Sequence, residues 1–219
     1  MNGPNNPIGW TDYTWDPVKG LCPVACPYCY ARRIYDRFHY DPTIRLDEKE
    51  LQAPFKLKES SRIFVGSTIE LFGNWIRSEW LERILEVVTQ LPQHTFIFLS
   101  KCPGRFKFFE FSNNCWTGAT ITQEDKTMGF LIQNAWESSA PVHFYSFEPL
   151  HSHIKIGLTF LNWIIIGAET GNRKGKIIPR QEWIKELIDA ADYEGIPVFM
   201  KDNIKPHWNG ELRQEFPFK

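Results

Sequence analysis

The run PRQEWIKELIDAADYEG at residues 179–195 lies between two apolar runs, WIIIGA at residues 163–168 and PVFM at residues 197–200. A short, uninterrupted apolar run is typical of a β-strand that is covered on both faces. The middle run has a helical pattern that opens with proline and closes at Gly195, the usual residue types at the two ends of a helix. Together the three runs predict a strand–helix–strand unit, the repeating element of a parallel sheet.

The same alternation extends through the rest of the chain. Five further β-rich runs occupy residues 9–15, 62–67, 95–100, 115–122 and 142–147, and three further helical patterns occupy residues 30–40, 78–90 and 123–137. Leu81, Leu85 and Val88 recur at helical spacing in the second of these patterns. That spacing predicts an amphipathic helix packed on a sheet.

The length of the chain limits the kind of barrel that it can form. It has 219 residues, whereas a closed eight-stranded barrel typically needs about 250. We therefore expect an α/β fold, a partial parallel (β/α)6-type TIM barrel with an additional C-terminal strand and an irregular tail over residues 203–219. An open, doubly wound sheet is the alternative. No linker or internal repeat divides the sequence, so we expect a single domain over residues 1–219.

The composition excludes several classes of protein. Hydrophobic residues make up 42% and charged residues 23%, as in globular proteins and unlike disordered or collagen-like chains. The net charge of −1 gives no global attraction to nucleic acid or anionic lipid. The longest apolar run is far shorter than the roughly 18 residues that cross a membrane, and the amino terminus has no signal-peptide pattern. We expect a soluble, cytoplasmic protein without a membrane partner, and the sequence does not indicate its oligomeric state.

Polar or reactive side chains end or follow almost every predicted strand. They are Ser67, Thr68, Glu70, Lys101, Cys102, Thr120, Thr122, Glu148, Glu169, Lys201 and Asp202. In barrels and open sheets of the α/β class, ligands bind at the carboxyl ends of the strands. These side chains are therefore candidates for one site, although loops are commonly polar without having a function.

Three of the five cysteines, Cys22, Cys26 and Cys29, form a C-x3-C-x2-C loop after the first predicted strand. The odd number and the clustering indicate a metal site in a reducing compartment and not a disulfide framework. Three thiolates on one short loop can bind a single metal cluster and leave one coordination position open.

A zinc site is the alternative interpretation of the same cysteines. Structural zinc needs four protein ligands, and the sequence has no second pair of closely spaced cysteines or histidines. The fourth ligand could come from His39, Cys102 or Cys115. On this interpretation the protein is a non-catalytic, zinc-stabilised binding module.

The cysteine loop, with Tyr28 directly before the third cysteine, resembles that of the radical S-adenosylmethionine superfamily. The resemblance implies that Cys22, Cys26 and Cys29 bind three irons of a 4Fe-4S cluster and that the fourth iron binds S-adenosylmethionine. It further implies an enzyme that reductively cleaves S-adenosylmethionine to a 5'-deoxyadenosyl radical for hydrogen abstraction. The electron would come from an external reductant such as a flavodoxin or ferredoxin. An iron–sulfur protein that binds S-adenosylmethionine without cleaving it is a further alternative.

Five other segments resemble, in order, the signatures of a phage-type family of unassigned function in that superfamily. They are IGWTDYTWDPVKG, FVGSTIELFG, FLSKCPGR, SFEPL and WIIIGAETG. The match covers most of the chain.

Spore photoproduct lyases are more distantly similar, and their cysteine loop also continues Tyr-Cys-Tyr. This likeness implies that Ser67, Lys101 and Thr120 help to hold the cofactor, and that Tyr28 lies against the adenine or the cluster rim. The superfamily's usual Gly-Gly-Glu contact to the methionyl amine is missing here, and the Gly66-Ser67 pair with Glu70 could substitute for it. The likeness also favours a nucleobase, nucleotide or nucleic acid as the substrate.

Three residues are candidates for chemistry on that substrate. Glu148 and Glu169 could each bind a polar group or position a proton, or could only hold their loops in place. Cys102 could donate a hydrogen atom to a product radical, or could be a small buried hydrophobe. Basic clusters at residues 32–37, 101–107 and 173–180 could receive a nucleic acid if two of them flank the barrel mouth, or could be solvated surface.

Overall fold

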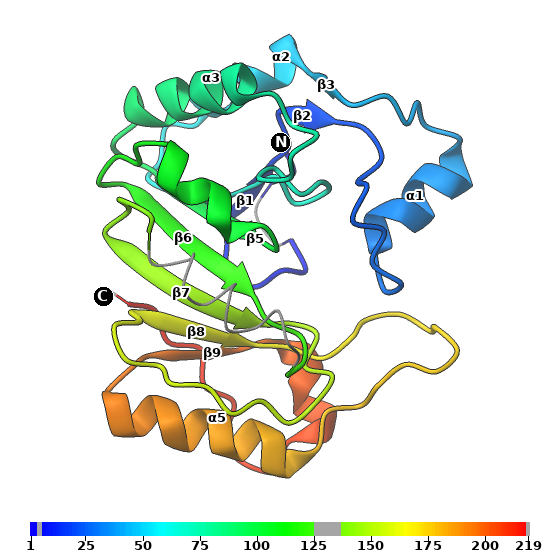
Figure 1. The fold of residues 1–219 in the computed structure, drawn as a ribbon, viewed down its shortest axis with the longest axis vertical. Coiled ribbons are helices and arrows are strands. Elements are labelled where there is room, and N and C mark those ends of the chain that lie inside the picture. Colours follow the sequence, from blue (N-terminus) through cyan, green and yellow to red (C-terminus); the bar gives the residue numbers. More distant parts are fainter. Residues whose placement is uncertain (4–5, 125–136, 218–219) are drawn as a thin grey trace.

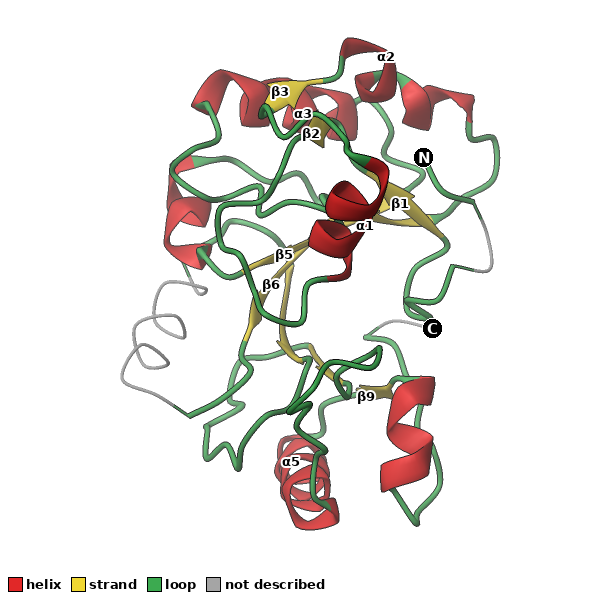
Figure 2. Ribbon diagram, turned by 90° about the vertical axis from the view of Figure 1, so that its right-hand side faces the viewer, coloured by secondary structure: helices red, strands yellow, loops and turns green. Residues whose placement is uncertain are grey.

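The computed structural model describes residues 1–3, 6–124 and 137–217. Its main sheet has seven parallel strands that pair with their neighbours in chain order. They are β1 (Tyr13–Trp15), β4 (Arg62–Val65), β5 (Thr95–Ser100), β6 (Cys115–Thr120), β7 (Val142–Phe147), β8 (Trp163–Ile166) and β9 (Val198–Met200). Figure 2 views the sheet nearly along its strands, as an arc from β1 to β9. Because the strand order never reverses, the sheet is a half-barrel and not a doubly wound sheet.

Helices and short elements cover or extend this arc. The helices are α1 (Tyr30–Phe38), α2 (Glu48–Leu51), α3 (Ser78–Thr89) and α5 (Gln181–Glu194), with 3-10 helices η1 (Ala53–Lys56), η2 (Pro103–Phe108) and η3 (Asp202–His207). A two-stranded antiparallel ribbon pairs β2 (Val18–Lys19) with β3 (Arg45–Leu46). In the described ranges, no helix is long and apolar enough to cross a membrane.

Strict alternation of strand and helix is not what the structure shows. The helix predicted over residues 123–137 falls on residues 125–136, which lie outside the described residues. The connection from β5 to β6 holds only η2, and residues 148–162 between β7 and β8 form no helix. Ile154, Leu158 and Leu161 of that connection are buried in the same cluster as α5. They cover the sheet as a helix would, so a regular helix is not needed there.

The outer face of the sheet is packed in two halves. Leu81, Leu85 and Val88 of α3 are buried over β4 and β5, which confirms the predicted amphipathic helix. Ile184 and Leu187 of α5 are buried over β7, β8 and β9. Figure 1 shows α3 and α5 on opposite sides of the molecule. Burial of these apolar faces fixes the curvature of the arc between the two helices.

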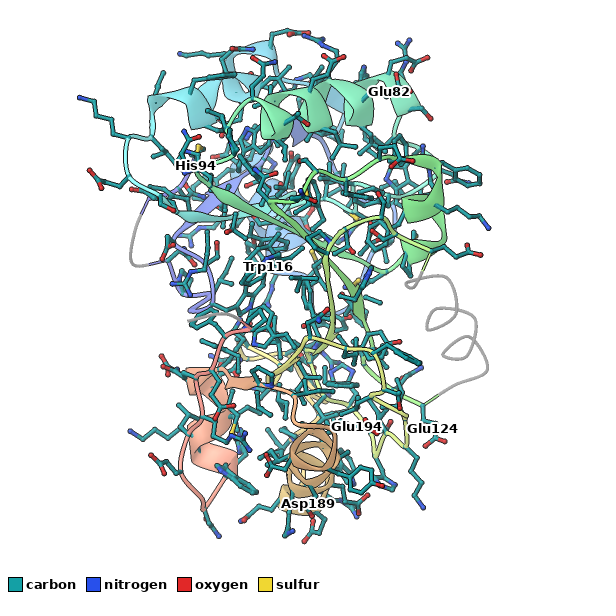
Figure 3. All side chains as sticks on the ribbon, turned by 90° about the vertical axis from the view of Figure 1, so that its left-hand side faces the viewer. Glu82, His94, Trp116, Glu124, Asp189 and Glu194 are labelled. Carbon is teal, nitrogen blue, oxygen red and sulfur yellow. The ribbon has the colours of Figure 1, made fainter. Side chains whose placement is uncertain are left out.

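The inner face of the arc is filled by aromatic side chains at the end where the strands begin. Trp163 lies at their centre, with ring centroids 5.7 Å from Trp116, 5.4 Å from Phe144 and 6.2 Å from Trp10. Figure 3 views this end of the molecule, with Trp116 between Glu82 on α3 and Asp189 on α5. The barrel interior is therefore closed at this end.

The C-terminal tail, expected to be irregular, is partly ordered against the open side of the arc. After η3, Gln214 forms an antiparallel bridge with Phe199 of β9. The ring of Phe216 stacks on Trp163 at 5.6 Å, and the Arg62 guanidinium lies 3.9 Å from the centre of the Phe216 ring. Aromatic stacking and cation–π contact thus join the two edges of the half-barrel.

Gly118 provides a test of the interior packing. A Cβ atom at Gly118 would lie 2.5 Å from the Phe144 ring, and Phe144 in turn packs on Trp163. We expect Gly118→Ala to lower the free energy of unfolding by about 1–3 kcal/mol, because the buried ring must shift. Gly157→Ala is the matched control, since a Cβ there meets nothing within 4 Å. Urea unfolding followed by tryptophan fluorescence measures both, and equal effects of the two substitutions would contradict the packing described.

Candidate functional site

A cavity of about 230 Å³ lies at the carboxyl ends of the strands. Figure 2 looks toward this end of the sheet, with α1 in front of it. The cavity brings together nearly all of the predicted site residues: Cys22, Cys26, Cys29, Tyr28, Ser67, Glu70, Lys101, Thr120, Glu148 and Glu169. Residues that are distant in the sequence thus meet where an α/β barrel binds its ligands.

The cysteine loop is held in place by its two ends. At the start, Gly20 has φ +127°, and a Cβ there would lie 2.6 Å from the Ile44 backbone, so only glycine fits. At the end, Cys29 caps α1, and its Sγ accepts a hydrogen bond from the Arg32 N–H at 3.5 Å. The Arg32 guanidinium donates to the Cys22 carbonyl at 2.7 Å. These contacts hold the loop so that all three cysteines line the cavity.

The three thiols share the cavity without forming a single-ion site. In the described part of the chain, no three His, Cys, Asp or Glu side chains are arranged to hold one metal ion. A tetrahedral zinc site needs its sulfurs close around one point, whereas cysteines on a cluster bind different irons. Burial raises the pKa of the Cys22 thiol, which accepts a hydrogen bond from the Glu70 N–H at 3.4 Å.

Asp16 fixes the loop that follows β4. Its buried carboxylate accepts hydrogen bonds from the Ser67 hydroxyl at 2.9 Å and from the Thr68 N–H at 3.0 Å. The Tyr30 hydroxyl donates to the Ser67 carbonyl at 3.1 Å, which ties α1 to the same loop. Ser67 is therefore presented to the cavity from a rigid backbone.

Glu70 links the loops after β4 and β5. One carboxylate oxygen accepts from the Ser100 hydroxyl at 2.6 Å and the Phe72 N–H at 3.0 Å, and the other accepts from the Lys101 N–H at 2.7 Å. The side chain is buried. The carboxylate already accepts three hydrogen bonds from the chain itself, so its role is to position Lys101.

Lys101 and Trp10 line the cavity, and each has a polar group without a partner in the described part of the chain. The Lys101 ammonium makes no ion pair with the carboxylates of the described residues, although it lines the cavity. The Trp10 side chain lines the cavity, and its indole N–H is buried and has no acceptor among the same residues. Thr120 reaches the cavity from the end of β6. The ammonium and the hydroxyl suit a ligand that carries a carboxylate and other acceptor groups.

The two candidate catalytic carboxylates are both paired. Glu148 forms an ion pair with Lys201, across β7 and β9. Glu169 is buried and accepts two hydrogen bonds from Arg173, at 2.7 and 2.8 Å. The Arg173 guanidinium holds the pKa of the Glu169 carboxyl below its usual range. An ionised, paired carboxylate is suited to holding a loop or accepting a hydrogen bond, and not to donating a proton.

His151 joins Glu169 to the cysteine loop. Its Nε2 lies 3.1 Å from Glu169, and its ring meets the ring of Tyr28 edge to face, with centroids 5.3 Å apart. Burial and the nearby Cys26 thiol raise the pKa of Tyr28. Tyr28 is thus neutral and fixed at the cavity wall, between two of the cysteines.

The structure does not bring Cys102 to the cavity. Its side chain packs against the core beneath α3. Burial and the nearby Glu70 raise the pKa of Cys102 to about 11. Its thiol also interacts with that of Cys22, which lines the cavity, so its hydrogen-donor role stays a prediction. The other residues named as fourth zinc ligands, His39 and Cys115, also lie outside the cavity lining.

Asp16 and His151 are residues near the site that the sequence did not single out, and Arg173 was predicted only as part of a basic cluster. Asp16 directly follows β1, as the other candidates follow their strands, so its position could have identified it. His151 and Arg173 act through Glu169 and lie in long loops, where no periodic pattern marks them.

The hydrogen bonds of Glu70 generate a prediction for the metal-free protein. In Glu70→Gln, one acceptor oxygen is replaced by an amide that must face a buried donor. We expect the free energy of unfolding to fall by about 1–3 kcal/mol. Glu110→Gln, at an exposed position, is the control and should change it by less than about 0.5 kcal/mol. Thermal unfolding checks this, and a Glu70→Gln protein as stable as the wild type would show that the carboxylate does not join the loops.

Comparison with known proteins gives one family. No curated protein and no solved structure is significantly similar to the chain. A family model described as "Protein of unknown function (DUF5131)" matches residues 5–213, which include every residue of the cavity. The chain therefore belongs to the DUF5131 family of proteins of unknown function.

Proposed function

We propose that the protein is a radical S-adenosylmethionine enzyme with one 4Fe-4S cluster on Cys22, Cys26 and Cys29. The observation that carries the proposal is the cavity, where a C-x3-C-x2-C loop faces polar side chains from the ends of the parallel strands. When bound, the cluster and S-adenosylmethionine would supply a 5'-deoxyadenosyl radical that abstracts hydrogen from the substrate. The cleavage consumes one electron, so the proposal includes an external reductant such as a flavodoxin or ferredoxin.

The donor set at the cysteine loop fits a cluster with an open iron. Three thiols line the cavity and no fourth cysteine does. Of the residues that could complete a zinc site, His39 is exposed and Cys115 is buried in the core, and Cys102 lies near Cys22 but outside the cavity lining. The donor set therefore favours the cluster over the zinc-stabilised binding module.

The remaining polar groups fit S-adenosylmethionine. The Lys101 ammonium can pair with the methionyl carboxylate, with Glu70 holding its backbone in place. Thr120 can hydrogen-bond to ribose through its hydroxyl, whereas the Ser67 hydroxyl donates its proton to Asp16 and can only accept, as from the methionyl amine. Glu70 is then a positioning residue, and Ser67 is the residue that we assign to the contact with the methionyl amine.

The walls of the cavity fit chemistry that must exclude water. Phe64, Leu99 and Ile8 line its apolar part, and the aromatic interior closes it from below. The Glu148–Lys201 pair lies on the side of the cavity formed by the later strands. We assign this pair to substrate orientation, and the fold to the partial (β/α)-barrel type that the superfamily uses.

Replacement of single cysteines tests the proposal. After anaerobic reconstitution, the wild type should hold about four irons and form 5'-deoxyadenosine with dithionite and S-adenosylmethionine. Cys22→Ala, Cys26→Ala and Cys29→Ala should each lose most of the iron and all 5'-deoxyadenosine formation. Cys102→Ala and Cys115→Ala are the controls and should keep both.

Two outcomes would contradict the proposal. One is a wild-type protein that binds stoichiometric zinc and loses it on replacement of His39, Cys102 or Cys115. The other is a protein that holds the cluster and binds S-adenosylmethionine but forms no 5'-deoxyadenosine, which would make it a binding protein only.

A further inference from the structure

Helix α1 exposes aromatic side chains beside the cavity. Ala31 is the one residue of the helix that is fully buried. Tyr30, Ile34 and Phe38 recur every four residues and form one exposed stripe. Tyr30 also lines the cavity, so the stripe begins at the cavity mouth. An exposed apolar stripe at a site mouth indicates a surface that binds something.

The stripe ends in a ready-made aromatic stack. The rings of Phe38 and Tyr40 are 5.7 Å apart and nearly parallel, at 22°, and they remain 54% and 55% exposed. The Arg37 guanidinium lies 5.3 Å from the centre of the Phe38 ring. A flat, exposed stack of this kind can accept a further planar group, such as a nucleobase.

Basic side chains converge on the same mouth from a second element. The loop between β8 and α5 carries Arg173, Lys174 and Lys176, and its Thr170 lines the cavity. The Arg33 guanidinium of α1 packs on this loop, 2.8 Å from where a Cβ of Gly171 would lie. The two basic segments are therefore adjacent. They form a local positive patch on a protein whose net charge is only −1.

Few carboxylates oppose this charge. Glu169 is already paired with Arg173, and Glu148 with Lys201. Asp36 is the one acidic residue of α1. Arg37 and Lys174 are exposed and form no ion pair with a described residue. The mouth thus presents uncompensated positive charge beside exposed aromatic rings, which is the combination that binds single-stranded nucleic acid.

We propose that this mouth surface, which runs from the cavity mouth along α1 to Tyr40 and over the loop after β8 and is formed by Arg33, Arg37, Phe38, Tyr40, Lys174 and Lys176, binds single-stranded nucleic acid and directs one nucleotide into the cavity. What happens to that nucleotide rests on the proposed function, whereas the docking does not. The phosphates contact the basic side chains, and a base stacks on the Phe38–Tyr40 pair. A base held in a duplex cannot enter a cavity behind α1 without leaving its stack, so the single strand is the expected form.

Two double variants separate the charge from the stacking. Arg37→Glu with Lys174→Glu should weaken binding of a short fluorescent single-stranded oligonucleotide at least tenfold, measured by anisotropy. The slope of the logarithm of the binding constant against the logarithm of the salt concentration should also become less steep by roughly 1.4, since each lost phosphate contact contributes about 0.7 to it. Phe38→Ala with Tyr40→Ala should weaken binding about fivefold or more and leave the salt dependence unchanged.

Lys56→Glu with Lys58→Glu is the matched control. Both lysines are exposed, and they precede β4, away from the carboxyl ends of the strands. The control has the same change of net charge and should alter affinity by less than about twofold. DNA and RNA oligonucleotides identify the sugar, and the corresponding duplexes should bind more weakly than the single strands.

The inference is overturned if no oligonucleotide binds, if duplex binds as tightly as single strand, or if the control weakens binding as much as the mouth variant. It is also overturned if the mouth variant keeps oligonucleotide binding but loses reduction by flavodoxin, since the surface would then dock the reductant. Iron content and 5'-deoxyadenosine formation are measured separately, without oligonucleotide. An enzyme that forms 5'-deoxyadenosine but binds no oligonucleotide refutes this inference alone, and a protein with the reverse behaviour refutes the proposed function alone.

Discussion

Trp163 and the aromatic rings around it close one end of the half-barrel, and the position of the cavity depends on that closure. The sheet curves between α3 and α5, and its two edges are bridged inside by Trp10, Phe199 and Phe216. Close packing leaves no space for a ligand at the end where the strands begin. The free volume therefore lies where the strands end, and the polar residues that follow them surround it.

A second constraint lies in the loops above that packed end. Loops are the least rigid part of an α/β fold, yet the ones that carry Ser67 and Lys101 are fixed by buried carboxylates. Asp16 holds the first of these loops, and Glu70 joins it to the second. Hydrogen bonds from backbone N–H groups to a buried carboxylate are among the stronger ones in proteins, so the side chains are presented with little freedom. A site that must hold a reactive cofactor needs such preorganisation.

The sequence predicted the strands well because several of them, such as β6 and β8, are buried along their whole length and all are rich in β-formers. All seven predicted runs contain a strand, and the main differences are at their ends, as at residues 9–15, where only Tyr13–Trp15 is a strand. The ribbon of β2 and β3 was not predicted, because two-residue strands have no periodic pattern. The order of the tail was also missed, since it depends on one ring, Phe216, that stacks on a residue distant in the sequence.

The sequence predicted most of the residues that line the cavity, but not which of them form hydrogen bonds and ion pairs with one another. The position after a strand was enough to identify Lys101, Thr120 and Glu169. It could not show that Cys102 lies outside the cavity lining, or that Glu70 is engaged by backbone donors. Those outcomes depend on contacts between loops, which no local pattern encodes. The mouth surface is a similar case, because α1 and the loop after β8 meet only in the folded chain.

The central claim is that the three cysteines hold a cluster with one iron open to S-adenosylmethionine. Electron paramagnetic resonance of the anaerobically reconstituted, dithionite-reduced protein tests it most directly, with and without S-adenosylmethionine. The account predicts a reduced-cluster signal that shifts when S-adenosylmethionine is added. A protein that takes up no iron but binds one zinc ion, or a cluster whose signal does not change with the cofactor, would contradict it.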